Sequence, residues 1–131
     1  DKTEGKADGE EKEGEGTEQK KEKKGKGNLR LSEFLVNLND PLVRRYLKCV
    51  INLRLSKASY VDEINENENI IPELRDKIFD IVSDKSYADL KSSAGKVMLK
   101  EEIMISVNEI LYETFKTEPV IKVMFSKFIL Q

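Results

Sequence analysis

The 131-residue sequence contains no histidine and no tryptophan, and it has a single cysteine. Histidine is the side chain that most often acts as a general base near neutral pH, so the usual proton-transfer group is missing. One cysteine cannot form an internal disulfide, and metal sites built from His and Cys are excluded. The composition therefore argues against an enzyme and predicts neither a metal nor a cofactor.

Glycine is scarce outside the first 27 residues, which hold six of the seven glycines. No P-loop, dinucleotide-binding fingerprint or Gly-x-Ser-x-Gly elbow occurs, so no phosphate-cradling loop is expected. Long apolar runs are also missing, because no stretch approaches the ~18 residues that suggest a membrane span. The start at Asp1 leaves room for a membrane helix upstream, which would be missing from this chain.

Charge is concentrated at the start of the chain, where residues 1–27 carry 17 charged side chains and one aliphatic residue, Ala7. Ordering a residue costs about 1–2 kcal/mol, and without apolar side chains nothing offsets that cost. We therefore predict a disordered charged linker over 1–27 and one folded domain over 28–131. The linker lysines could contact anionic lipid, but their acidic neighbours favour a solvated tether. The folded part is nearly neutral, which argues against nucleic acid as a partner.

The hydrophobic pattern of the folded part begins with strands. Residues 46–55 alternate apolar and polar side chains, which indicates a strand with one buried face. The segment 29–38 precedes it, and Asn39-Asp40-Pro41 between them is a turn signal, so an antiparallel hairpin is expected. Residues 56–69 are polar and lack the spacing of a calcium loop. In the last segment, 120–130, both faces of the predicted strand are substantially apolar, which is typical of a central strand or one whose second face is covered.

Helical spacing governs the middle of the chain. We predict one helix from Asn69 to about Ser83, with Pro72 in its first turn, and a short capped turn from Ser86 to Leu90. A longer helix begins at Ser92 or Ser93 and runs to about Tyr112 or Phe115. The predicted fold is therefore α+β: a small sheet of about three strands in the order ββααβ, with two main helices packed on it. The expected core residues are Leu47, Cys49, Ile51, Leu53, Leu74, Ile78, Leu99, Ile103, Val107, Ile110, Leu111, Val123 and Phe125.

The helices also carry neighbouring charges of both signs, which could select a partner across a contact between molecules. Arg75, Lys77, Lys100 and Glu102 are the candidates for such a contact. Ordinary solvated helix surface is the other interpretation of each. Cys49 alternates with the buried side of its strand and is expected to be a small core residue rather than a reactive thiol.

Six short segments follow one another along the chain: Asn39-Asp40-Pro41, Arg45-Tyr46-Leu47-Lys48, Pro72-Glu73-Leu74-Arg75-Asp76, Ser83 to Leu90 with its Tyr87-Ala88-Asp89-Leu90 ending, Asn108-Glu109-Ile110-Leu111 and Phe125 to Gln131. Together they resemble the C-terminal domain of the FliL family of flagellar basal body-associated proteins. No one of them is specific, but their order and spacing over residues 33–131 are.

This resemblance implies a single-pass protein of the bacterial inner membrane whose C-terminal domain lies in the periplasm. It implies a fold like the stomatin/prohibitin (SPFH) domain, a homo-oligomeric ring around the flagellar stator proteins MotA and MotB, and support of stator recruitment, torque and motility. The charged linker would then join the membrane helix to the ring. The alternative is a generic membrane-anchored periplasmic scaffold or adaptor that has no part in motility.

Overall fold

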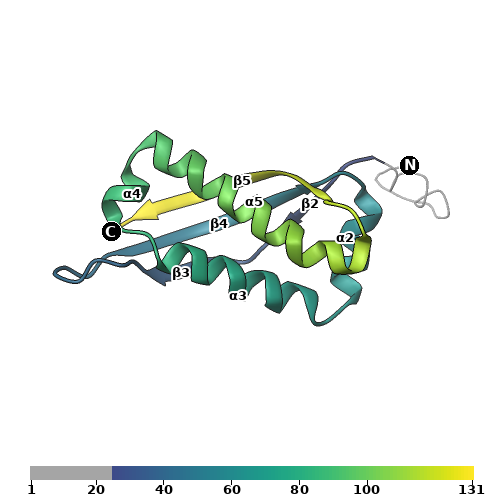
Figure 1. Ribbon diagram of the computed structural model, residues 1–131, viewed down its shortest axis with the longest axis horizontal. Coiled ribbons are helices and arrows are strands. Elements are labelled where there is room, and N and C mark those ends of the chain that lie inside the picture. The colour runs from purple at the N-terminus through teal and green to yellow at the C-terminus, as the bar shows by residue number, and fades with distance from the viewer. Residues whose placement is uncertain (1–24) are drawn as a thin grey trace, which may run out of the picture.

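A computed structural model of the chain describes residues 25–131 (Figure 1). Most of the expected linker, residues 1–24, lies outside the described residues. The first strand begins at Gly27, and Gln131 closes the chain at the opposite end of the long axis (Figure 1). No helix of the described part is long and apolar enough to cross a membrane.

Four strands form one antiparallel sheet, and β4 is the central strand with which the other three pair. β5 pairs with β4 from Leu47↔Leu130 to Leu55↔Val120, which occupies one whole edge of β4. β2 and β3 therefore lie end to end along its other edge. The strand bounds are β2 (Gly27–Arg30), β3 (Phe34–Asn37), β4 (Tyr46–Leu55) and β5 (Val120–Leu130).

The strand predicted over 29–38 is thus two strands. Arg30 pairs with Asn52 and Phe34 with Cys49, so four steps along the edge oppose three along β4, which is a bulge. Arg75 holds this interruption by donating hydrogen bonds to the carbonyl oxygens of Ser32 (2.7 Å) and Glu33 (3.1 Å). Its guanidinium also lies 4.0 Å from the centre of the Phe34 ring.

β5 contains two further irregularities, which correct the prediction of a strand with two apolar faces. Phe125 pairs with Ile51 and Lys127 with Val50, so Ser126 is an extra residue, and the register shifts again beside Leu55. The bulge changes which side chains share a face. Val123, Phe125, Phe128 and Leu130 consequently all face the core, and β5 is an edge strand whose other face mixes Lys122 and Lys127 with Met124 and Ile129.

Four helices follow β4 in the sequence and precede β5. They are α2 (Ala58–Glu66), α3 (Ile70–Ser83), α4 (Tyr87–Lys91) and α5 (Ser93–Phe115). The bounds of α3, α4 and α5 follow the pattern of apolar spacing and caps. Ser86 and Asp89 form a capping box on α4, and the Ser92 hydroxyl accepts the Gly95 N–H at the start of α5. α2 was missed, because its segment carries only one fully buried side chain, Ile64.

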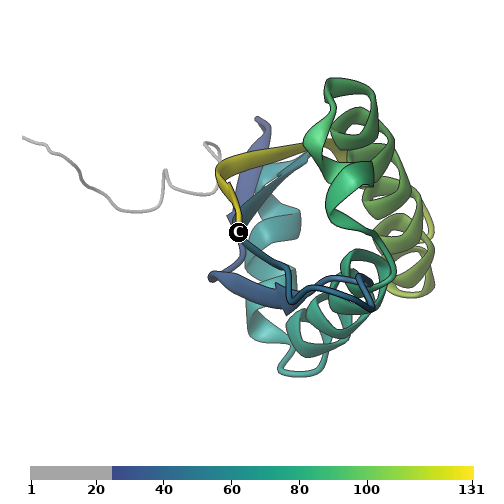
Figure 2. The same ribbon diagram turned by 90° about the vertical axis from the view of Figure 1, so that its left-hand side faces the viewer.

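The helices cover one face of the sheet (Figure 2). Every second side chain of β4, from Leu47 to Leu55, points toward the helix layer and is buried. Nearly all of the expected core residues are buried between the sheet and the helices. Ile110 and Phe125 differ, since both are only partly buried and pack at the margin of the core. The second face of the sheet is left without a covering element in the described part of the chain.

Two close contacts fix the ends of these layers. A Cβ atom on Gly95 would lie 1.6 Å from the carbonyl oxygen of Asp89, so only glycine lets α5 start against α4. At the start of β5, the buried Asn108 side chain donates to the Val120 carbonyl (3.0 Å) and accepts from the Val120 N–H (2.9 Å). This pair of bonds ties α5 to the first residue of the edge strand.

Candidate interaction surfaces

The uncovered face of the sheet is basic. The four strands contain five Lys or Arg residues and no Asp or Glu. Residues paired in an antiparallel register share a face, and the register places all five opposite the core. We call this surface the sheet face, and its cations are Arg30, Lys48, Arg54, Lys122 and Lys127.

Neutral and apolar side chains lie among these cations. Leu35 and Ile129 flank Lys48 in one cross-strand row and are 61% and 40% exposed. The Arg54 guanidinium donates to the side-chain oxygen of Asn28 at 3.3 Å. The face thus has an excess of positive charge beside exposed aliphatic groups, which is suited to contact with an acidic, partly apolar surface.

One acid lies at the edge of this face. The Lys127 ammonium is 2.7 Å from a carboxylate oxygen of Glu33, and this hydrogen bond lowers the pKa of the Glu33 carboxyl below its usual value. The pair spans the hollow above Val50, which is lined by Arg30, Glu33 and Lys127. Both side chains are more than 40% exposed, so the pair orients Lys127 more than it stabilises the fold.

The opposite side of the molecule presents the outer ridge of α5. Met98, Ile105 and Tyr112 are 67%, 60% and 52% exposed. Residues seven apart differ by only ~20° around an α-helix, so these three form a line about 21 Å long. We call this line and its flanking carboxylates the α5 ridge. The flanking residues, all exposed, are Glu101, Glu102, Glu109 and Glu113.

The lysines of α5 lie elsewhere and leave the ridge acidic. The Lys96 ammonium is 5.2 Å from the centre of the Phe128 ring, and the Lys100 ammonium is 5.8 Å from that of Phe125. The two rings contact each other edge to face at 4.9 Å. Both cations therefore cover the aromatic side of β5.

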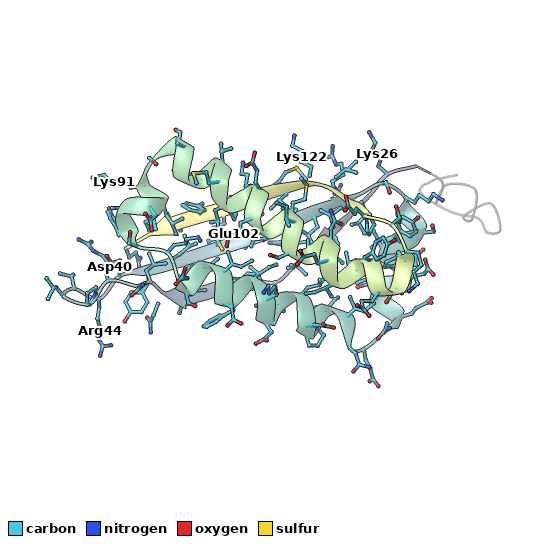
Figure 3. The ribbon with its side chains drawn as sticks, in the orientation of Figure 1. Lys26, Asp40, Arg44, Lys91, Glu102 and Lys122 are labelled. Carbon is cyan, nitrogen blue, oxygen red and sulfur yellow. The ribbon has the colours of Figure 1, made fainter. Side chains whose placement is uncertain are left out.

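The four candidate contact residues occupy different environments. Arg75 holds the bulge between β2 and β3, Lys100 covers Phe125, and Glu102 pairs with Lys85 at 2.7 Å. Lys77 is exposed on α3. Figure 3 shows Glu102 on α5, between the margin that carries Lys122 and the α3 side of the molecule. Their part in contacts between molecules stays a prediction. The alternation of residues 46–55 indicated a polar outer face that includes Lys48 and Arg54, but the extended basic surface over all four strands was not predicted.

The hairpin between β3 and β4 projects at the end of the molecule marked by Asp40 and Arg44 (Figure 3). Leu42 at its tip is 95% exposed. The hairpin is anchored by a hydrogen bond from the Tyr87 N–H to the Asp40 carboxylate (2.9 Å) and by Arg45, 4.3 Å from the centre of the Tyr87 ring. These contacts hold the base of the hairpin, from which the tip protrudes.

Reactive chemistry has little support in the described residues. Cys49 is fully buried, and desolvation raises the pKa of its thiol to about 12. The Asp89 carboxyl accepts the Ser86 N–H, which lowers its pKa. Between residues 25 and 131 no group of three or more His, Cys, Asp or Glu side chains is placed to hold a metal ion. The surfaces, rather than any cleft, carry the distinctive chemistry.

A sheet covered on one face, with a basic outer face and an acidic helix ridge, defines a small α+β domain whose distinctive features lie on its surfaces. The family model for the flagellar basal body-associated protein FliL matches residues 29–131. The flagellar protein FliL of Aquifex aeolicus (strain VF5) is 32% identical over 98 residues, which are 75% of this chain and 56% of that relative. The chain belongs to the FliL family, whose members are associated with the flagellar basal body. It spans about half the length of the curated relative it matches.

Proposed function

We propose that this chain is the periplasmic part of an inner-membrane FliL protein that forms a ring around the flagellar stator, MotA and MotB. In that place it supports stator recruitment, torque and motility as a structural partner without catalytic activity. The observation that carries the proposal is the family match over residues 29–131, which coincides with the folded unit that starts at Gly27.

The proposed anchor is a membrane helix upstream of Asp1, joined to the domain by the charged linker of residues 1–27. The linker would hold the domain clear of the bilayer and raise its local concentration, since tethering makes association effectively intramolecular. The fold that goes with this proposal is the stomatin/prohibitin type. The two chemically different sides of the domain support a unit that repeats side by side.

A clean deletion of the whole gene tests the function in the bacterium from which the chain comes. We expect filaments of normal number, because the domain is proposed to act on the stator, and lower torque at high load. Torque is measured with beads attached to filament stubs, and a restored wild-type copy is the control. Normal torque at every load in the deletion strain would overturn the proposal and favour a scaffold unconnected with motility.

A further inference from the structure

The two surfaces of this domain complement each other in charge and in polarity. The sheet face carries five cations and Glu33 at its edge, whereas the α5 ridge carries four exposed carboxylates, of which Glu102 is paired with Lys85. Both surfaces also contain exposed apolar groups, Leu35 and Ile129 on the sheet face and Met98, Ile105 and Tyr112 on the ridge. Each surface thus has on the same chain the partner that its chemistry requires.

The two surfaces lie on opposite sides of the molecule, because α5 packs its inner side on the covered face of the sheet (Figure 2). A chain therefore cannot satisfy both surfaces by itself. Contact between the sheet faces of two copies would oppose cations, and contact between two ridges would oppose carboxylates. Only the sheet face of one copy against the ridge of another brings unlike charges together.

The strand edges are poorly suited to the competing arrangement, in which copies pair strand to strand. β5 is bulged at Ser126 and carries Lys122 and Lys127, and bulges and lysines both disfavour the addition of a strand. The other edge is broken between β2 and β3, and Arg75 occupies the carbonyl oxygens of Ser32 and Glu33. Faces rather than edges are therefore available for repeated contacts.

We propose that copies of this chain associate head to tail, the sheet face of one copy resting on the α5 ridge of the next. This inference rests on the proposed ring and names its interface. Such a contact is heterologous, so each copy uses one of each surface, and the chain of contacts closes into a ring when the rotation permits. Electrostatic attraction orients the two surfaces, and burial of the apolar line on the ridge supplies the affinity.

Cysteine cross-linking tests the interface. Leu35→Cys places a thiol on the sheet face and Ile105→Cys one on the ridge, at positions 61% and 60% exposed. The full chain, bound by an N-terminal polyhistidine tag to neutral vesicles with a nickel-chelating lipid, is treated with a flexible bis-maleimide. Wild type controls for Cys49, which is fully buried, and Leu42→Cys, on neither surface, measures random collision.

Head-to-tail contact predicts covalent dimers when the two single variants are mixed, roughly tenfold above either alone. The double variant should give a ladder of larger products. Dimers that form as well within Leu35→Cys or Ile105→Cys alone would overturn the proposal in favour of a two-fold contact. Vesicle-bound assemblies without cross-links above the Leu42→Cys level would overturn this interface and leave the proposed ring standing. A chain that stays monomeric on the vesicles at every density would refute the ring itself.

Discussion

Leu47 and Leu42 are the same residue type in opposite surroundings. Leu47 is fully buried in β4, whereas Leu42 at the hairpin tip is 95% exposed. Leu47→Ala removes packed methyl groups and leaves a cavity, which should lower the free energy of unfolding by about 2–5 kcal/mol. Leu42→Ala should change it by no more than about 0.5 kcal/mol. Urea unfolding followed by circular dichroism measures both, and equal losses would contradict the assigned core.

A second prediction at the scale of one residue concerns the reactivity of the Cys49 thiol. Because burial raises the pKa of its thiol to about 12 from 9.0, the native protein should not react with a maleimide at pH 8, and reaction should follow unfolding by urea. Between about pH 9 and pH 12 the folded state keeps the thiol proton, whereas the unfolded state loses it. The contribution to stability is therefore full below about pH 9 and is lost as pH rises toward 12.

The loss of stability at alkaline pH that is due to the thiol can be isolated with the Cys49→Ala variant, which has no thiol to ionise. Its cavity lowers stability at every pH, so the quantity of interest is the difference from wild type. That difference should shrink as pH rises above 9, as measured by urea midpoints between pH 7 and 10.5. Rapid labelling of the native wild type at pH 8 would contradict the burial of Cys49.

At the scale of elements, the junction of α5 and β5 depends on one amide. Asn108→Ala leaves the buried N–H and C=O of Val120 without their partner, and an unsatisfied buried group costs about 1–3 kcal/mol. A loss of about 2–4 kcal/mol is expected in thermal or urea unfolding. Glu109→Ala, exposed on the same turn, is the control and should be nearly neutral. Equal stability of the two variants would show that the junction is held by other contacts.

The broken edge of the sheet depends on Arg75. Arg75→Lys keeps the charge but loses the planar group that reaches two carbonyl oxygens and stacks on Phe34. A loss of about 1–2 kcal/mol is expected, with faster hydrogen exchange at the amides near the bulge. Lys77→Arg, on the exposed side of the same helix, is the matched control. A variant as stable as this control would mean that Arg75 is free to act in a contact between molecules.

The alternation in β4, interrupted only by the buried Val50 on its outer face, and the apolar spacing of α3 and α5 made these elements predictable from sequence. The starts of α4 and α5 were predictable because a serine side chain caps each helix, which is a local interaction. α2 was missed, although Tyr60, Val61 and Ile64 have helical spacing, because its other residues are polar. The spacing of these three side chains is the signal that could have revealed it.

The β5 part of the sheet face could not be predicted, because it depends on the bulge at Ser126. Lys122 and Lys127 would fall on opposite faces of a regular strand, since an odd number of steps separates them. The bulge at Ser126 returns Lys127 to the side of Lys122 and turns Phe128 toward the core. The position of a bulge depends on which residues of β5 pair with β4. Contacts across the sheet therefore decide it, rather than the local sequence.

At the scale of the whole molecule, positive charge lies on the outer face of the sheet and negative charge on the helix layer. Lys122 and Arg54 represent the basic layer, and Glu101 and Glu109 the acidic one. Changing the sign of two charges in one layer should remove most of the attraction and place like charges where the exchanged side chains meet the other layer, whereas changing both pairs restores opposite charges at those positions. Because these side chains are outside the core, the folded domain should tolerate either change, which circular dichroism checks.

Swimming in soft agar, in a deletion strain that expresses each variant, is the most direct measurement. Arg54→Glu with Lys122→Glu should impair swimming, and so should Glu101→Lys with Glu109→Lys. The variant that combines all four substitutions should swim better than either pair. Recovery in the combined variant is the result this account predicts. A combined variant that swims no better than the pairs, although folded and present at wild-type levels, would contradict it.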